Sequence, residues 1–355
     1  MKKQKVLMTG VTGVLGSAIF AGLEDVYEVY YLVRDGIYNH KLFIEIEHNK
    51  VYNSDVTKEL CGLSSFDIQQ LKEIGIDKFL HVAANVSFEI KDDKGKIWDD
   101  NYNGTFNAIA LAKELGVEEF LFCSTAFADD SRNPYEQSKL SAELLVKRCG
   151  LKYSIFRPSA IVGDSKTGYT PRYNGYYGAF AWLSTIAKRF PNCFNIYVMC
   201  DETSTLNLIS IDWISYTIIH LITSGAKNKI YYLTHDDPMP AKWIIEKTFE
   251  ILNISGVRYT NPVNDLRGNS GYDDVIMAKH ASNPQVARVQ KIVNPVLEKY
   301  HPYITFERKF SLESVKETLG VNFISPPAVD ENFLKTILKY AVEHNFGYDR
   351  PKQAA

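Results

Sequence analysis

The chain has 355 residues, of which 45% are hydrophobic and 13% aromatic, so it can bury a large core and is not expected to be disordered. Its 40 basic and 42 acidic residues leave a formal net charge of -2, which gives no indication of a nucleic-acid-binding surface. The five cysteines show no C-x-x-C spacing, so neither a disulfide framework nor a metal site is expected.

The N-terminal segment predicts a strand, a glycine turn and a helix. Val6 to Met8 form a short apolar run, the turn reads TGVTGVLG, and an apolar helix continues to Leu23. Gly10 permits a tight turn, Gly13 lets backbone approach a pyrophosphate, and Gly16 allows the helix to pack closely on the strand. Glycine is common in any tight turn between a strand and a helix, but this turn lies beside the N-terminus with a further strand after it, which favours dinucleotide binding.

The same segment has a basic start and an apolar run, as a secretory signal has. Three glycines and the acidic pair Glu24-Asp25 argue against a signal peptide. No apolar run approaches the length of a transmembrane helix. We therefore expect a soluble, cytoplasmic protein.

A second strand is expected from Glu28 to Val33, and Arg34 and Asp35 follow it. At this position a dinucleotide fold uses an acidic side chain for the ribose of NAD, or an arginine for the 2′-phosphate of NADP. Because Arg34 comes first, NADPH is the expected cofactor and NADH the alternative, against the reading of an ordinary surface pair. A third strand, Val51 to Asp55, either places the Asp55 carboxylate to accept from an adenine amine or ends in a simple turn.

The next predicted strand runs from Phe79 to Ala84. It ends in the small residues Ala83 and Ala84, which would let the cofactor lie flat against the sheet. His81 lies inside this apolar run, so a packed core histidine is expected rather than a catalyst.

Alternating helices and strands follow. A helix is expected from about Trp98 to Leu115, with Asn101 near its start, where the amide could hydrogen-bond backbone near the next helix. Then come a strand from Phe120 to Ser124, a helix from Tyr135 to about Cys149 and a strand from Tyr153 to Arg157. This alternation predicts an α/β fold with a doubly wound parallel sheet of the Rossmann type.

Tyr135 and Lys139 are four residues apart on the predicted helix, so their side chains project from one face. A phenol normally titrates near pH ~10, and a fixed cation beside it lowers its pKa and allows proton exchange near neutrality. Ser124 and Thr125 place hydroxyls at the end of the preceding strand, which faces the ligand crevice in open α/β sheets. A Tyr-x-x-x-Lys pair alone more often marks a solvated helix face.

The motifs TGVTGVLG, HVAA, NYNGT, CSTA, YEQSK and RPSAIVG, taken together, resemble the extended short-chain dehydrogenase/reductase superfamily over residues 5 to 163. Within it, HVAANVSF, FLFCSTAFA, PYEQSKLSAELLV and FRPSAIVGDSKTG look most like the fatty acyl-CoA reductase and carrier-protein thioester reductase branch. The resemblance implies a catalytic triad of Thr125, Tyr135 and Lys139. The cofactor contacts that it implies are Gly10, Thr12, Gly13, Val14, Leu15, Gly16, Arg34, Asp55, Val56, Ala83, Ala84, Asn101, Tyr135, Lys139 and Pro158.

After Asp164 the chain is rich in tyrosine and other aromatic residues, which form core more often than a ligand wall. Two later patterns are expected to return to the main sheet: a strand entering a helix over Leu206 to Leu221, and a last strand over Lys229 to Leu233. We therefore expect an NAD(P)-binding domain at 1–163, joined by 206–234. A smaller, mostly helical C-terminal substrate-binding lobe would comprise 164–205 and 235–355.

The resemblance implies an NADPH-dependent reductase of an acyl thioester, carried by CoA or by an acyl carrier protein, that yields aldehyde or alcohol by hydride transfer. A ketone, an alcohol of the hydroxysteroid kind or a nucleotide sugar is an alternative substrate, because the superfamily shares these residues. A dinucleotide-sensing module without turnover is a third alternative, and the intact Tyr135 and Lys139 pair argues against it. The expected partners are a small-molecule or carrier-bound acyl substrate and an acyl carrier protein, with no nucleic acid.

Overall fold

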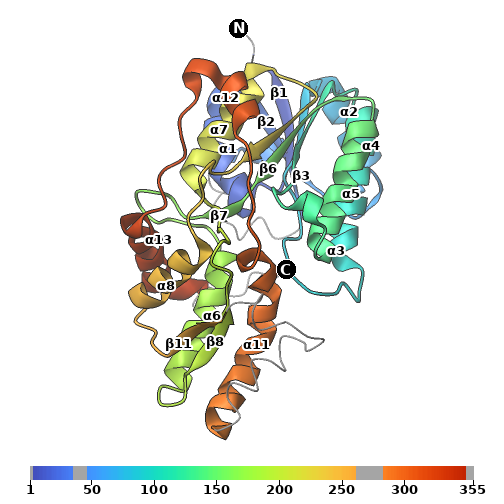
Figure 1. The fold of residues 1–355 in the computed structure, drawn as a ribbon. Coiled ribbons are helices and arrows are strands. Elements are labelled where there is room, and N and C mark those ends of the chain that lie inside the picture. The colour runs from blue at the N-terminus through green and yellow to red at the C-terminus, as the bar shows by residue number, and fades with distance from the viewer. Residues whose placement is uncertain (1–2, 35–45, 261–282, 349–355) are drawn as a thin grey trace.

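A seven-stranded sheet forms the centre of the computed structural model, which describes residues 3–34, 46–260 and 283–348 (Figure 1). The strands are parallel, in the order β10-β6-β5-β4-β1-β2-β3. Their bounds are β1 (Lys5–Thr9), β2 (Glu28–Val33), β3 (Val51–Asn53), β4 (Lys78–His81), β5 (Glu119–Cys123), β6 (Lys152–Pro158) and β10 (Lys229–Leu233). The order reverses between β1 and β4, and ligands of open α/β sheets bind outside the carboxyl ends of the strands at such a point.

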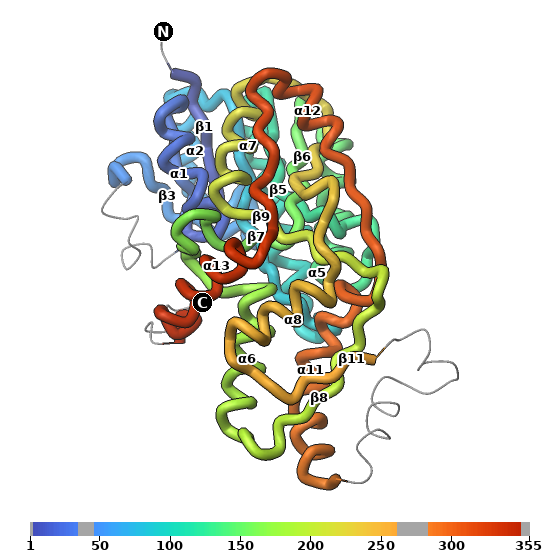
Figure 2. The backbone as a smooth tube through the Cα atoms, turned by 60° about the vertical axis from the view of Figure 1, so that its left-hand side comes forward, coloured from blue at the N-terminus to red at the C-terminus, as the bar shows by residue number. Residues whose placement is uncertain are grey.

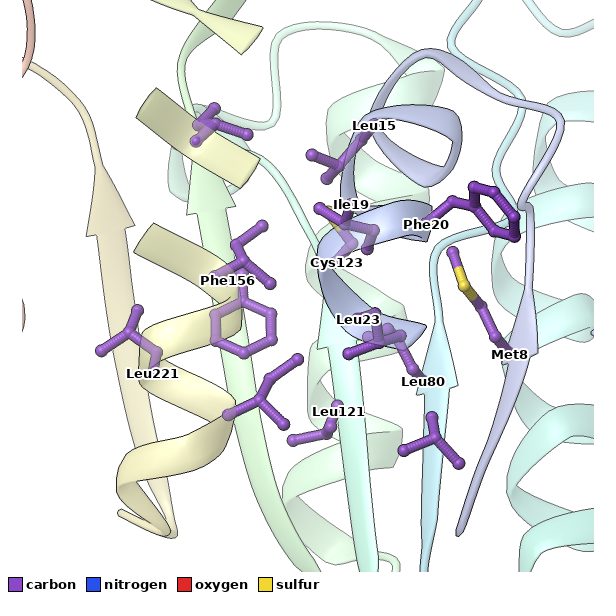
Figure 3. Close-up of a cluster of buried hydrophobic side chains, with 14 of the residues drawn as sticks. Met8, Leu15, Ile19, Phe20, Leu23, Leu80, Leu121, Cys123, Phe156 and Leu221 are labelled. Atoms are coloured by element: carbon purple, nitrogen blue, oxygen red, sulfur yellow. The ribbon is translucent and has the colours of Figure 1, made fainter. Parts of the chain in front are cut away.

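Helices cover both faces of the sheet. One face carries α1 (Val14–Val26), α7 (Ile211–Ser224) and α12 (Glu313–Leu319). Figure 3 shows Ile19 of α1 beside Cys123 of β5, and Leu23 of α1 near Leu121 of β5. The other face carries α2 (Ser65–Ile74), α4 (Gly104–Glu114) and α5 (Pro134–Arg148). Because both faces are covered, β4 and β5 are buried at every position, and the residues inside each strand are apolar without alternation.

A second group of elements lies below the sheet in Figure 1 and has its own hydrophobic core. It contains α6 (Tyr176–Arg189), α8 (Ala241–Ile251), α11 (Pro284–Ile304) and α13 (Glu331–Glu343), with a parallel pair of strands, β8 (Ile196–Met199) and β11 (Val257–Thr260). A second small pair joins β7 (Ala160–Val162) to β9 (Leu208–Ser210). The shorter elements are η3 (His48–Lys50), η4 (Glu59–Gly62), α3 (Lys96–Trp98), η5 (Asp99–Asn103), η6 (Ala128–Asp130), η7 (Gly320–Asn322) and η8 (Asn345–Gly347).

The expected α/β fold with a doubly wound parallel sheet is confirmed, and β2 and β10 have the bounds that the sequence predicts. Three details differ. The strand at the start of Leu206 to Leu221 pairs with β7 and does not join the main sheet. The strand that begins near Phe79 ends at His81, and the helix expected from Trp98 is interrupted by the π-helical turn η5.

The C-terminal part of the chain also departs from the expected lobe. The tube in Figure 2 shows the chain returning to the sheet at α12 before it reaches α13. Leu312, Val315 and Leu319 belong to the core that α1 and α7 form with the sheet. The lobe expected at 235–355 therefore lacks this segment, because its apolar side chains cover the face of the sheet near β10. The remaining division into domains stays a prediction.

In the described ranges, none of the helices is long and apolar enough to cross a bilayer.

Candidate active site

The glycine turn lies at the carboxyl end of β1, where the strand order reverses. Gly10 has a φ of +78°, and a Cβ on it would lie 2.4 Å from the backbone nitrogen of Ala83, so only glycine fits. A Cβ on Gly16 would lie 2.0 Å from the Gly10 carbonyl oxygen, which explains the close packing of α1 on β1. Gly13 is the N-cap of α1 and offers no side chain to the first-turn N–H groups. These groups are therefore available to an anionic ligand, as a pyrophosphate site requires.

The remaining residues of this turn lie around the same N-terminus. Val14 is the first residue of α1, Leu15 is buried against the sheet, and Thr12 is partly exposed between the two glycines. A side chain at Gly10 or Gly16 would collide with the backbone of this turn, so the turn depends on both glycines. The turn fits the pyrophosphate of a dinucleotide.

Thr9 and His81 connect the ends of β1 and β4. The Thr9 hydroxyl accepts from the backbone N–H groups of Val82 and Ala83, each at 3.2 Å, and lies 2.8 Å from His81 Nδ1. Since the Thr9 oxygen already accepts two hydrogen bonds, the Thr9 hydroxyl donates its own proton to His81, and His81 accepts it at Nδ1. Burial lowers the pKa of His81 to about 3, with a further contribution from the charge of Lys139. His81 is thus a neutral core histidine, as predicted, and it helps to hold Ala83 beside the glycine turn.

The adenosine side of the expected site lies at the ends of β2 and β3. Arg34 is exposed directly after β2, and Asp35 lies outside the described residues. Asp55 Oδ1 accepts from the Thr57 N–H at 3.0 Å and from its hydroxyl at 2.8 Å, so this carboxylate forms a turn with its own backbone. Burial would raise the pKa of Asp55, but the bonds from Thr57 and the charge of Arg34 outweigh it and lower the pKa. The turn reading of Asp55 is the one that these contacts support.

Asn101 lies in the π-helical turn η5 and is almost fully buried. Its side chain accepts from the Asn85 N–H at 2.7 Å and donates to the Asn85 carbonyl at 3.0 Å and to the Ser138 hydroxyl at 2.9 Å. Ser138 in turn donates to the Tyr135 carbonyl oxygen. Asn101 therefore ties the loop after β4 to the helix that carries Tyr135 and Lys139. A π-helical turn at such a place is frequent at functional sites.

Thr125, Tyr135 and Lys139 lie together at the end of β5 and the start of α5. The three residues are 5%, 8% and 2% exposed, and the Thr125 hydroxyl is hydrogen-bonded to the Tyr135 phenol. Helix α5 begins here because Asn133 caps it by accepting from the Glu136 N–H at 2.9 Å, with Pro134 at the first helical position. Tyr135 is thereby held in the first turn, and Lys139 lies one turn further along the same face.

The electrostatics of this cluster differ from the sequence prediction. Burial raises the pKa of Tyr135, the charges of Cys123 and Glu136 raise it further, and the bond with Thr125 opposes them. Burial also lowers the pKa of Lys139 to about 8. The predicted lowering of the Tyr135 pKa by Lys139 is not found, because burial dominates and the Lys139 ammonium lies over the Phe122 ring, 4.5 Å from its centroid.

Next to this cluster, the Ser124 hydroxyl is buried and has no hydrogen-bond partner among the described residues. Ala83 and Ala84 follow β4 in the adjacent loop, and the Pro158 carbonyl at the end of β6 accepts from the Ala126 N–H at 2.8 Å. Val56 follows Asp55 in the loop after β3, and its carbonyl oxygen accepts from the Asn107 side-chain amide at 2.9 Å. The ends of the parallel strands thus bring the predicted residues to one edge of the sheet.

Sequence reasoning missed a group of residues on the lobe side of Tyr135. The Phe88 ring packs edge-on against Tyr135, with 5.5 Å between centroids, and against Tyr303 at the same distance. Phe127 packs against Tyr303 at 5.3 Å. The contact between Phe88 and Tyr303 joins the loop after β4 to helix α11, a distant part of the chain. No local pattern in the sequence indicates it.

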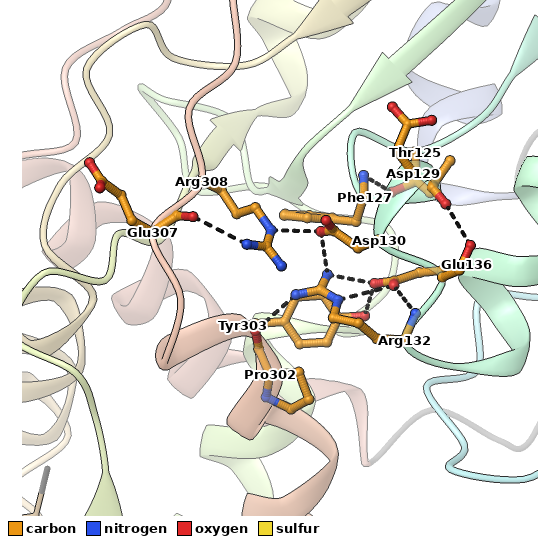
Figure 4. Close-up of polar contacts among 12 residues, drawn as sticks. Thr125, Phe127, Asp129, Asp130, Arg132, Glu136, Pro302, Tyr303, Glu307 and Arg308 are labelled. Carbon is orange, nitrogen blue, oxygen red and sulfur yellow. Dashed lines mark hydrogen bonds and ion pairs between the residues drawn. The ribbon is translucent and has the colours of Figure 1, made fainter. Parts of the chain in front are cut away.

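The arginines beside Phe88, Phe127 and Tyr303 are paired with carboxylates (Figure 4). Arg132 donates to Glu136 through Nη2 at 2.6 Å and Nε at 3.0 Å, and Arg308 donates to Asp130 at 2.7 Å. Deeper in the molecule, Arg157 is paired with Glu143 and Asp129. Arg172 is exposed. Tyr176, Tyr177 and Phe180 are core residues, which is the arrangement favoured for the aromatic stretch after Asp164. The described residues contain no cluster of three or more His, Cys, Asp or Glu side chains that could hold a metal ion.

Comparison with known proteins identifies the relatives of this architecture. Residues 6–181 match the NAD dependent epimerase/dehydratase family. The NAD-dependent glucose-6-phosphate dehydrogenase of Haloferax volcanii is 30% identical over 173 residues, 46% of this chain and 59% of that protein. The Adenylate-forming reductase Nps9 of Serpula lacrymans var. lacrymans is 26% identical over 228 residues, 53% of this chain and 20% of that protein. The chain thus matches less than two thirds of the length of either relative.

Among solved structures, the terminal R domain from the myxalamid PKS-NRPS biosynthetic pathway has the same fold. The TM-score is 0.72 at 20% identity, and the match covers 100% of this chain and 93% of that chain. The match includes the lobe as well as the sheet, because it spans the whole chain. The resemblance to the extended short-chain dehydrogenase/reductase superfamily is confirmed.

Proposed function

We propose that this chain, whose residues 6–181 match the NAD dependent epimerase/dehydratase family, is a nicotinamide-dependent reductase of acyl thioesters. The observation that carries the proposal is the buried cluster of Thr125, Tyr135 and Lys139 at the end of β5, beside a glycine turn that fits a pyrophosphate. Two hydroxyls and an ammonium in one buried place provide a proton donor, a second hydrogen-bond donor and a fixed charge.

In the proposed reaction, Thr125 and Tyr135 donate hydrogen bonds to the carbonyl oxygen of the thioester. A nicotinamide dinucleotide held at the glycine turn would supply the hydride for the carbonyl carbon. Tyr135 gives its proton to the developing oxyanion, and Lys139 contributes a buried positive charge to the site. The resulting hemithioacetal loses the thiol and leaves an aldehyde as the product, or a second hydride from another reduced dinucleotide would give the alcohol. Tyr135 regains its proton from solvent after each step.

The lobe side of the site supports an acyl group as the substrate. The surface near Tyr135 is aromatic, formed by Phe88, Phe127 and Tyr303. Arg132 and Arg308, the neighbouring cations, are already paired with carboxylates, so they are poorly placed to bind the diphosphate of a nucleotide sugar. The similarity to a reductase that forms adenylates and to an R domain points in the same direction.

NADPH is the proposed cofactor, because Arg34 is exposed directly after β2, where a 2′-phosphate would lie. The proposed cofactor contacts are those that the resemblance implies, with Asp55 the weakest of them, since its carboxylate is bonded to Thr57. The region around α6, α8 and α11 is the proposed substrate lobe. An acyl carrier protein is the proposed partner that delivers the thioester.

A sugar substrate is the second candidate, favoured by the similarity to a glucose-6-phosphate dehydrogenase. The deciding experiment measures NADPH and NADH oxidation with acyl-CoA and acyl carrier protein thioesters, and NADP and NAD reduction with glucose 6-phosphate and UDP-sugars. The proposal expects turnover with thioesters and NADPH. Turnover with a sugar alone would contradict it, and tight NADPH binding without turnover on the whole panel would indicate a sensing module.

A further inference from the structure

The last turn of α11 contacts the first turn of α5, although the two are about 170 residues apart in the chain. The Tyr303 hydroxyl donates to Glu136 Oε1 at 2.7 Å and accepts from the Asn133 side-chain amide at 2.8 Å. Asn133 is the N-cap of α5, and its side-chain oxygen accepts from the backbone N–H of Glu136. Tyr135 lies between these two residues, so the Tyr303 hydroxyl touches both sides of the turn that carries Tyr135.

The Glu136 carboxylate that accepts from Tyr303 depends on its hydrogen-bond donors. Its side chain is fully buried, and a buried carboxylate is costly unless hydrogen bonds satisfy it. Besides Tyr303, the donors are the Arg132 backbone N–H at 2.8 Å and the Arg132 guanidinium (Figure 4). Arg132 also donates to the Pro302 carbonyl oxygen at 2.8 Å, immediately before Tyr303. Two consecutive residues of α11 therefore hold the same buried carboxylate in place.

The ring of Tyr303 adds a second kind of contact. The Arg132 guanidinium lies over it, 4.2 Å from the centroid, and Phe88 packs against its edge. Phe88 also packs against Tyr135. The ring thus fixes the position of Tyr303, and the hydroxyl transmits that position to the cap of α5.

From these contacts we propose that Tyr303 is a positioning residue of the reaction, acting through Glu136 and Asn133 to set the direction of the Tyr135 phenol. This inference rests on the proposed function for its kinetic consequence. A misplacement of about 1 Å in a catalytic group can cost on the order of 100-fold in rate. Tyr303 belongs to α11, so the position of the lobe and the orientation of Tyr135 are coupled.

The test replaces Tyr303 by phenylalanine, which removes the hydroxyl and keeps the ring. The expected result is a fall in kcat of roughly 10-fold or more with a much smaller change in the KM for NADPH, because most of the implied cofactor contacts lie at the glycine turn and after β2, away from Tyr303. Tyr300→Phe is the matched control: it removes a hydroxyl one turn earlier on α11 that has no hydrogen bond to the described residues, and should leave kcat unchanged. A Tyr303→Phe protein that keeps kcat within about twofold of wild type overturns the proposal.

A double-mutant comparison tests the route through Glu136. Glu136→Met keeps most of the side-chain volume and removes both oxygens, including the one that accepts from Tyr303. If Tyr303 acts through this side chain, adding Tyr303→Phe to Glu136→Met lowers kcat by much less than it does in the wild type. If the fold-losses in kcat of the two single variants multiply in the double variant, the two residues act independently and this route is wrong.

A second readout does not depend on the proposed substrate. Ring-labelled tyrosine gives an NMR signal for Tyr135 that is assigned by its loss in Tyr135→Phe, with and without NADPH. The signal should shift in Tyr303→Phe and stay in place in Tyr300→Phe. If the wild type reduces no thioester, the proposed function fails while this comparison still decides on Tyr303, and an unmoved Tyr135 signal overturns the inference.

Discussion

The Lys139 ammonium lies 4.5 Å from the centroid of the Phe122 ring and is almost completely buried. It is held in the candidate active site by packing and a cation–π contact, and burial lowers its pKa to about 8. The unfolded chain would titrate this lysine near its ordinary value of 10.5. The difference makes the stability of the protein depend on pH in a definite direction.

Below pH 8, Lys139 is protonated in both states and the cost of burying its charge is fully present. Between about pH 8 and 10.5 the unfolded chain keeps a proton that the folded chain has released, so the folded state gains stability as pH rises. Relative to Lys139→Met, the wild type should gain on the order of 1 to 3 kcal/mol across this window. Denaturant unfolding of both proteins at several pH values measures this, and parallel stability curves would contradict it.

The glycine turn gives a prediction about cofactor binding. A Cβ on Gly13 would lie 3.2 Å from the Gly10 carbonyl, a tight contact that a small shift can relieve, but the methyl group would project where a pyrophosphate is expected. Gly13→Ala should fold with nearly the wild-type Tm and bind NADPH at least about 10-fold more weakly. Calorimetric titration checks this. Gly10→Ala serves as the contrast: its Cβ would lie 2.4 Å from a backbone nitrogen, so this variant should fail to fold stably. Unchanged NADPH affinity in Gly13→Ala would show that the turn is not part of the cofactor site.

Arg34 should decide between the two nicotinamide cofactors. It is exposed after β2, so removing it costs little stability but removes a cation from the expected 2′-phosphate position. Arg34→Ala should raise the KM for NADPH about 10-fold or more and leave that for NADH unchanged. Arg258→Ala, which removes an exposed arginine from β11 in the lobe, is the control. Equal effects on both cofactors would show that Arg34 does not read the phosphate.

Phe88 should influence which acyl groups the site accepts. Its ring contacts Tyr135 and Tyr303 and fills space on the lobe side of the phenol. Phe88→Ala should increase kcat/KM for thioesters branched next to the carbonyl, relative to straight-chain ones, by roughly 10-fold, since one lost ring opens room for several methylene groups. Phe106→Ala, at an exposed aromatic residue of α4, is the control. A substrate preference that stays constant in Phe88→Ala places its ring outside the acyl site.

Local signals in the sequence were enough for most of the sheet. The strand from Glu28 to Val33 is bounded by an acidic residue and a charged pair, and β2 has those bounds. The glycine turn could be read because Gly10 and Gly16 are needed for close backbone approach, which constrains residue type directly. His81 could be assigned to the core because it lies within an apolar run.

Long-range contacts were beyond the same reasoning. Nothing near Tyr135 indicates that Phe88 and Tyr303 pack beside it, since these contacts depend on the path of the loop after β4 and on the end of α11. The pKa of Tyr135 was predicted from Lys139 alone, whereas burial by the surrounding fold decides its direction. The strand within Leu206 to Leu221 was expected in the main sheet because its apolar pattern does not distinguish β7 from β10 as its partner.

The most direct test of the central claim is NADPH oxidation by the wild type and by Tyr135→Phe, with acyl-CoA and acyl carrier protein thioesters as substrates. Both proteins should bind NADPH with similar affinity, so that the comparison isolates the proton donor. The wild type should turn over thioesters, and Tyr135→Phe should lose at least about 100-fold in kcat, the usual contribution of a positioned proton donor. A Tyr135→Phe protein that reduces thioesters at close to the wild-type rate would contradict the account.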